Sequence, residues 1–227
     1  MRQGATGPSS WRRGTTDRGV LGESALDRMI RRSRRPDAEE RCELCGTDVA
    51  PSHGHVLDVE HDQVLCACRA CALLFERDAA AEGRYRLVPD VRVRLNGYPL
   101  TELGIPVGLA FFVQQDADGP VVAHYPSPVG ATRWELPSAT WSEVLLGCPP
   151  LRSMRPRVEA LLVNTVRGAN EHWLVSIADC FRLVAAVRRD WKGMSGGRQV
   201  WETIDRFFAD LGRSQRPQPR TVEEGAP

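Results

Sequence analysis

Five cysteines fall close together near the start of this chain, with the spacing of thiolate ligands for a metal ion. They are Cys42, Cys45, Cys66, Cys68 and Cys71. In a Cys-x-x-Cys pair, one tight turn lets both sulfurs reach the same ion, and two such pairs about twenty residues apart are typical of zinc sites. We therefore predict a four-cysteine metal site formed by Cys42, Cys45, Cys68 and Cys71, with zinc as the metal.

Cys66 stands outside these two pairs and has more than one interpretation. It can replace Cys68 as the alternative ligand, add a fifth thiolate, or pack as a small apolar side chain. His53, His55 and His61 lie between the pairs and offer further ligand atoms. The spacing alone does not choose among these roles.

Iron is the alternative metal, because a tetrahedron of four thiolates suits iron as well as zinc. Such a centre would make the protein a rubredoxin-like electron carrier. The second pair lacks the Pro and Gly residues that generally surround rubredoxin cysteines, since Ala72 directly follows Cys71. The sequence therefore favours zinc over iron.

Short elements must bring the two pairs together. Residues 55–59 and 64–68 are strand-like runs on either side of a polar turn, which predicts a hairpin, and residues 70–81 are rich in helix formers. Gly46 follows the first pair and can adopt the positive φ that such knuckles often need. A knuckle, a hairpin and a thiol pair at a helix start predict a treble-clef module over residues 41–84. A zinc ribbon is the alternative if the last element is a strand.

Treble-clef modules are also the scaffold of His-metal nucleases, in which a histidine beside an acidic residue activates water. Glu60, His61 and Asp62 resemble such a dyad. The position after the second pair, where those enzymes commonly carry Asn or His, is Ala72, and an apolar run follows it. A nuclease-like enzyme is therefore the weaker functional alternative.

A larger α+β domain is expected over residues 85–212. Alternating or continuous apolar runs predict strands of a mainly antiparallel sheet at residues 91–95, 105–113, 121–125, 158–164, 173–177 and 181–188. The polar segment 116–119 predicts a hairpin turn between two of them. The fold class is thus α+β, with a small four-cysteine module followed by an antiparallel sheet domain.

Two helices are predicted in this larger domain. Thr140 and Glu143 form a capping-box pattern for a helix that stops at Gly147. Residues 197–211 carry apolar side chains on one face, which predicts a C-terminal amphipathic helix across the sheet, with Ser195 placed to cap it. His124, His172, Asp179 and Cys180 could take part in catalysis, but no spacing assembles them into a site, so no catalytic residue is assigned.

The composition of the chain indicates its general class and its surroundings in the cell. The chain has 227 residues, a net charge of +1 and seven cysteines, an odd and clustered number that fits a reducing compartment better than a disulfide framework. No apolar run is long enough to span a bilayer, and no overall basic field attracts nucleic acid. Residues 1–40 read as a flexible basic arm with a short helix, and residues 213–227 as a disordered tail. We expect a cytoplasmic protein that contacts neither membrane nor nucleic acid.

Several segments resemble an uncharacterised actinobacterial family whose genes accompany operons of uptake nickel–iron hydrogenases. These segments are residues 125–132, 158–163, 180–184 and 191–201, and the resemblance extends over about residues 41–211. It implies an accessory factor for such an enzyme, or a companion in electron transfer, with a hydrogenase subunit or a maturation factor as the partner. We therefore expect a non-enzymatic, metal-binding accessory protein.

Overall fold

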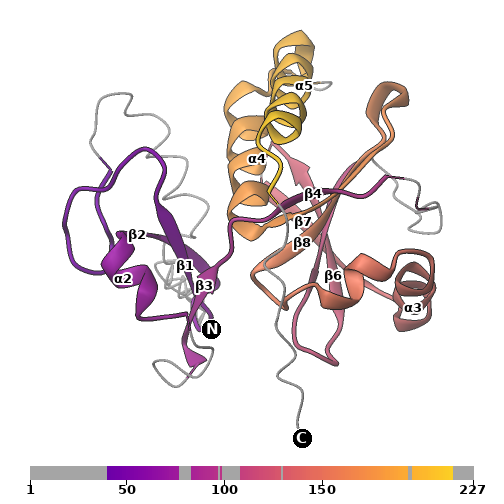
Figure 1. Cartoon of the computed structure of the whole chain (residues 1–227). Helices are drawn as coiled ribbons and strands as arrows, with labels where there is room; N and C mark the ends of the chain where they lie inside the picture. The colour runs from indigo at the N-terminus through magenta and orange to yellow at the C-terminus, as the bar shows by residue number, and fades with distance from the viewer. Residues whose placement is uncertain are drawn as a thin grey trace, which may run out of the picture.

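The structure, a computed structural model, describes residues 40–76, 83–96, 98, 108–128, 130–193 and 196–216. Within these residues the chain forms one sheet of three strands and one of six, with helices on both faces of the larger sheet (Figure 1). The fold is α+β with antiparallel sheets, as the sequence predicts. The predicted arm before residue 40 and the predicted tail beyond residue 216 lie outside the described residues.

The small sheet contains the predicted hairpin. Strands β1 (Gly54–Asp58) and β2 (Gln63–Ala67) pair antiparallel, which confirms that prediction. Strand β3 (Tyr85–Val88) pairs with the other side of β1, so the strand order is β2-β1-β3. The sequence places the residues of β3 in the larger domain, and strand pairing instead adds them to the small sheet.

Helix α2 (Arg69–Leu73) follows β2 directly and is shorter than the helix predicted over residues 70–81. The chain leaves helical geometry after Leu73 and turns as far as Glu76, and residues 77–82 lie outside the described part. The elements therefore follow in the order knuckle, hairpin, helix. The short helix has no buried residue, so apolar packing does not extend it.

The large sheet has the strand order β4-β9-β8-β5-β6-β7, and all of its neighbouring strands are antiparallel. Its strands are β4 (Arg92–Arg94), β5 (Leu109–Gln114), β6 (Val121–Ser127), β7 (Gly130–Leu136), β8 (Glu159–Asn164) and β9 (Glu171–Ser176). The sequence predicts each of these strands except β7. Residues 132–135 of β7 are exposed on an edge of the sheet, so the strand lacks the continuous apolar run that marks the buried strands β5, β8 and β9.

Helices cover both faces of the large sheet. Helices α4 (Ile177–Asp190) and α5 (Gly197–Arg213) lie on one face, and α3 (Ser138–Gly147) and the 3-10 helix η3 (Pro149–Ser153) lie on the other (Figure 1). A second 3-10 turn, η4 (Val166–Gly168), joins β8 to β9. Strand β5 shows the division, because Phe111 packs toward α4 and α5 while Phe112 packs toward α3.

The strand predicted over residues 181–188 is wrong, because this segment belongs to α4. Its buried positions include Cys180, Val184 and Val187, which recur at the spacing of one helix face. Ser176 caps the helix by accepting a hydrogen bond from the backbone N–H of Asp179 at 3.1 Å. The helical spacing and the cap outweigh the β-branched character of the apolar run.

The two predicted helices are present, although their starts differ from the prediction. Helix α3 begins at Ser138 after Pro137 and has no side-chain cap, so Thr140 lies inside the helix and the predicted capping box is wrong. Helix α5 begins after Gly196, whose φ is +83°, and Ser195 lies outside the described residues. Helix α5 packs against α4, which contacts the sheet.

The two sheets share one buried cluster. Leu57, Val64 and Val88 of the small sheet pack in the same cluster as the residues of α4 and α5. The guanidinium of Arg157 also donates a hydrogen bond to the carbonyl of Val59 at 3.0 Å, which fastens the end of β1 to the larger part. Of the helices in the described ranges, none has the length and the apolar character that crossing a bilayer requires.

Candidate metal centre

The four cysteines of the two Cys-x-x-Cys pairs lie together. The sulfur atoms of Cys42, Cys45, Cys68 and Cys71 are all within 4.8 Å of one another. The Sγ atoms of Cys45 and Cys68 are 3.7 Å apart. Sulfurs arranged tetrahedrally about an ion at roughly 2.3 Å are separated by about 3.8 Å. The spacing and the soft donor set therefore fit a zinc-sized ion.

The first knuckle is shaped by its backbone. The N–H of Cys42 donates to the carbonyl of Thr47 at 2.7 Å, and the N–H of Gly46 donates to the carbonyl of Cys42 at 2.8 Å. Gly46 has a φ of +80°, and a Cβ built there would meet no atom within 4 Å. The backbone angle, and not a lack of space, therefore requires glycine at this position.

The second pair begins helix α2. Cys68 is the N-cap residue, and its Sγ accepts a hydrogen bond from the N–H of Cys71 at 3.5 Å. Two hydrogen bonds connect the first knuckle to β2. The N–H of Glu43 donates to the carbonyl of Cys66 at 2.9 Å, and the N–H of Cys66 donates to Oε2 of Glu43 at 2.8 Å. These two hydrogen bonds fix the position of the first cysteine pair relative to the second.

The thiols of this cluster differ in acidity. Burial raises the pKa of Cys42, but the backbone N–H groups of Cys68, Cys45 and Leu44 outweigh it and lower the pKa to about 6. The neighbouring thiols of Cys45 and Cys68 raise the pKa of Cys71 to about 12. One thiol of the cluster thus loses its proton easily, and the repulsion between thiolates opposes the loss of further protons. A divalent cation would relieve this repulsion.

All seven cysteines lie in the described residues, and none of them forms a disulfide. Cys148 and Cys180 are buried in the larger part, where burial raises the pKa of both thiols. These two residues are separate from the four-cysteine cluster. Reduced thiols are the state in which such a cluster binds a metal.

Cys66 joins a different group of side chains. Ligand atoms of His53, His55 and Cys66 lie within 4.8 Å of one another, and the two imidazole rings are 4.7 Å apart between centroids. Burial lowers the pKa of His55 to about 4, with a further contribution from His53, so its imidazole is neutral at neutral pH. The structure thus places Cys66 beside the histidines, not among the four cysteines.

The residues considered for nuclease chemistry build the turn between β1 and β2. The carboxylate of Asp58 accepts hydrogen bonds from the backbone N–H groups of Glu60 and His61 and lies 3.0 Å from Nδ1 of His61. Asp58, Glu60 and His61 also form a third group of clustered ligand atoms. Asp62 is paired with Arg133 at 3.1 Å, which fixes the turn on the larger part.

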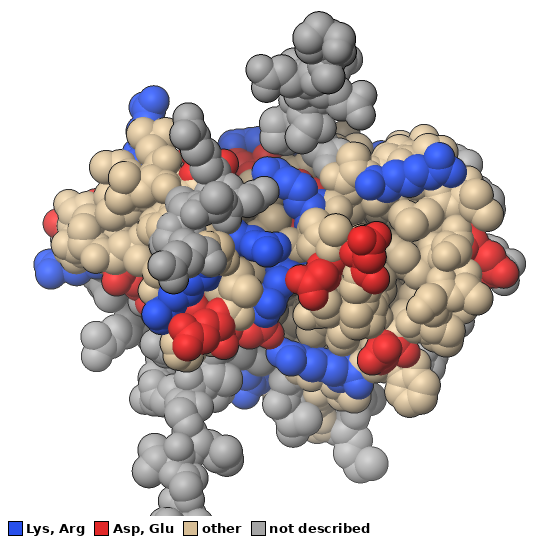
Figure 2. All heavy atoms as spheres, turned by 90° about the horizontal axis from the view of Figure 1, so that it is seen from below, with Lys and Arg blue, Asp and Glu red and all other residues tan. Residues whose placement is uncertain are grey.

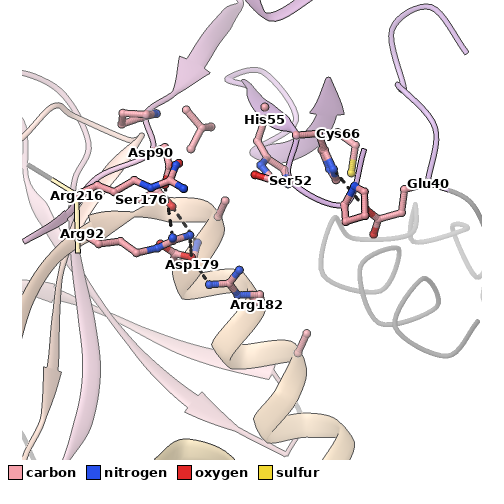
Figure 3. A pocket seen from close by; sticks show the side chains of 17 residues that line it. Glu40, Ser52, His55, Cys66, Asp90, Arg92, Ser176, Asp179, Arg182 and Arg216 are labelled. Carbon is pink, nitrogen blue, oxygen red and sulfur yellow. Dashed lines mark hydrogen bonds and ion pairs between the residues drawn. The ribbon is translucent and has the colours of Figure 1, made fainter. Parts of the chain in front are cut away.

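The polar candidates of the larger domain are not assembled into one site. His124 is buried and stacks on Phe111, with ring centroids 4.7 Å apart. Asp179 forms ion pairs with Arg92 at 2.9 Å and with Arg182 at 2.5 Å. Arg92 and Asp179 are 87 positions apart, so no local spacing signals this pair. Figure 3 shows these two arginines converging on Asp179.

The surface does not gather one kind of charge on the face seen in Figure 2. Basic and acidic side chains alternate there among the described atoms. Ion pairs such as Arg133 with Asp62 and Arg84 with Glu60 contribute to the mixture of charges on the molecule. The visible face therefore lacks the basic stripe typical of a nucleic-acid groove.

Comparison with known proteins identifies a family for this chain. No curated protein and no solved structure matched the chain. A family of unknown function, DUF5947, matched residues 41–215, a segment that contains all four cysteines of the cluster and every strand of both sheets. The chain therefore belongs to the DUF5947 family of unknown function.

Proposed function

We propose that the protein is a non-enzymatic, zinc-binding accessory protein, and that Cys42, Cys45, Cys68 and Cys71 hold the ion. The observation that carries this proposal is the convergence of four sulfurs from two knuckles within 4.8 Å. Four protein ligands close the coordination sphere of zinc and leave no position for a substrate. The site is therefore structural, in a module of treble-clef type.

The small module needs such an ion. Helix α2 has five residues and none of them is buried, so neither its length nor its packing can hold it in place. Its contacts with the rest of the module include the thiols of Cys68 and Cys71, which lie beside those of the first knuckle. Zinc bonded to both knuckles would fix α2 on the hairpin and stabilise the module.

Two exposed leucines beside the site support a role in docking. Leu73 is 53% exposed and Leu74 is 67% exposed, at the end of α2. Adjacent exposed apolar side chains on a rigid, metal-held turn suit contact with another protein. The resemblance to a family encoded beside uptake nickel–iron hydrogenases suggests the partner, a hydrogenase subunit or a maturation factor.

The metal proposal is tested by elemental analysis and an absorption spectrum on protein purified without oxygen. We expect bound zinc, no visible absorption, and loss of the equivalent held by the four cysteines in Cys45→Ser. Cys148→Ala is the matched control, because Cys148 is a buried thiol outside the cluster, and it should keep its zinc. Iron with visible thiolate-to-metal absorption would replace the proposal with the rubredoxin-like alternative.

The accessory role is tested separately in a cell that encodes the protein and an uptake hydrogenase. Deleting the gene should impair hydrogen uptake and hydrogenase maturation, and the Leu74→Glu variant should restore them poorly compared with the wild type. Unchanged maturation and uptake after deletion would contradict the hydrogenase partner and leave the zinc site unaffected.

A further inference from the structure

A second group of ligand atoms lies beside the four-cysteine cluster and is separate from it. It consists of one atom each from His53, His55 and Cys66, all within 4.8 Å of one another. His53 and His55 flank Gly54 at the start of β1, and Cys66 pairs directly with His55 across the β1–β2 ladder. The pairing of the two strands thus fixes the thiol opposite one imidazole, and two nitrogens and one sulfur are donors that zinc accepts.

The ring of His53 is oriented as in a metal-binding histidine. Its Nδ1 lies 2.9 Å from the carbonyl oxygen of Ala50 and 3.4 Å from a carboxylate oxygen of Glu40. A carbonyl oxygen only accepts, so Nδ1 carries the hydrogen and Nε2 carries the lone pair. Ligating histidines typically donate their other N–H to a carbonyl or a carboxylate in this way.

Nε2 of His53 is buried and has no hydrogen-bond partner among the described residues. The His53 side chain is only 7% exposed, so water does not reach this nitrogen freely. A buried acceptor without a partner is costly in a folded protein. A bound cation would satisfy it.

The three side chains line a cavity of about 490 Å³. Figure 3 shows His55, Cys66 and Glu40 on one side of it, and Asp179 and Arg182 of α4 on the other. Three protein ligands leave one position of a tetrahedral ion for water or another oxygen donor. The cavity supplies the room for that fourth ligand, which the closed four-cysteine site lacks.

We propose that His53, His55 and Cys66 form a second divalent-metal site, for zinc or an ion of similar preference, with its fourth coordination position open to this cavity. Glu40 and the carbonyl of Ala50 are its outer partners, which orient His53 through Nδ1. This site goes beyond the structural zinc proposed above, because an open position can bind an exchangeable ligand.

The test is the zinc stoichiometry of the full chain after dialysis against metal-free buffer, measured by elemental analysis. We expect two equivalents in the wild type and one in His53→Gln, His55→Gln and Cys66→Ala. His61→Gln is the matched control, because His61 is a histidine of the same hairpin that lies in another group, and it should keep two. Glu40→Gln should retain the second ion about 10- to 100-fold more weakly, as outer partners do.

Two further measurements separate this proposal from the structural zinc. Cys45→Ser should lose the zinc equivalent held by the four cysteines, whereas His55→Gln should keep it. Retention of that equivalent in His55→Gln would show that this variant is folded. In cobalt-substituted protein, His55→Gln should lower the thiolate-to-cobalt absorption by the share of one thiolate. A wild type with a single equivalent that is lost in Cys45→Ser and kept in His55→Gln would overturn the second site alone. The reverse pattern would overturn the four-cysteine proposal alone.

Discussion

The first knuckle depends on two kinds of residue. Cysteines supply the sulfur atoms, and a glycine allows the backbone turn that positions them. Cys42 and Cys45 supply the sulfurs, and Gly46 supplies the positive φ that closes the turn. The neighbouring amides lower the pKa of Cys42, so part of the negative charge that a cation needs is prepared by the backbone. Each of these contributions can be removed singly.

Replacing Cys71 by Ser should release the ion held by the four cysteines and unfold helix α2. Structural zinc contributes roughly 10 to 16 kcal/mol to small domains, and one ligand carries a large share of that. Zinc analysis and far-ultraviolet circular dichroism would measure the two losses together. If Cys71→Ser keeps the same number of zinc equivalents as the wild type and keeps its helix, Cys71 is not a ligand.

Replacing Gly46 by Ala should destabilise the protein by about 1 to 2 kcal/mol, the usual cost of left-handed geometry for a residue with a Cβ. Urea unfolding of the zinc-loaded protein would measure this. Gly212→Ala is the control, because a Cβ there also meets no atom within 4 Å but the residue lies in helix α5. That change should be neutral or stabilising. Equal losses for both variants would contradict a backbone cause.

At the scale of helices and strands, the sequence pattern predicts most elements but not all of them. The hairpin β1–β2, the central strands β5, β8 and β9 and helix α5 are all predictable, because each has a continuous apolar run or a helical apolar face in its own sequence. Helix α4 is mistaken for a strand because its apolar residues also suit one, and β7 escapes prediction because it is an exposed edge. The four-cysteine cluster follows from spacing, whereas the group of Cys66 with two histidines depends on strand register, which no sequence spacing reveals.

Helices α4 and α5 are joined by a buried polar bond. The hydroxyl of Thr203 donates to the carboxylate of Asp190 at 2.6 Å. Arg189 lowers the pKa of Asp190, and Thr203 contributes in the same direction. Stability from this depressed pKa is present above the unfolded value and is lost as the pH falls through the folded one.

Thr203→Val keeps the shape of the side chain and removes the hydroxyl. We expect a loss of roughly 1 to 3 kcal/mol at neutral pH, because the buried carboxylate is left with one donor fewer. The difference between variant and wild type should shrink in acid, where Asp190 is protonated. Denaturant unfolding at neutral pH and in acid would measure both values, and a constant difference would contradict the role assigned to the charge.

At the scale of the whole molecule, a buried histidine makes the fold sensitive to acid. Burial lowers the pKa of His124 to about 4, and the charge of Arg133 adds to the effect, whereas an exposed histidine has a pKa of 6.5. Between these values the unfolded chain binds more protons than the folded one. Stability therefore falls as the pH falls from about 6.5 to 4, by up to about 1.4 kcal/mol per pH unit.

His124→Phe should flatten this dependence while keeping the stack on Phe111. Unfolding free energies of wild type and variant, measured from neutral pH down through this window, isolate the contribution of His124, because both proteins carry the same proposed metal ligands. Parallel pH profiles for the two proteins would contradict it.

The shared core should make both sheets unfold together. Leu57 is 1% exposed and packs with the residues of α4 and α5, so Leu57→Ala should cost about 2 to 5 kcal/mol. Release of zinc and the change in tryptophan fluorescence, to which buried Trp173 of the large sheet contributes, should occur in one transition that is shifted by the same amount. Two separate transitions would show that the sheets are independent.

Leu57, Val64 and Val88 belong to the small sheet, but their side chains are buried in one core with residues of α4 and α5. A small sheet that packs in this way could not be transferred alone to another protein, because the new host would have to present a matching apolar face. We therefore expect the two sheets to be inherited together, and the range of the family match, residues 41–215, includes both of them.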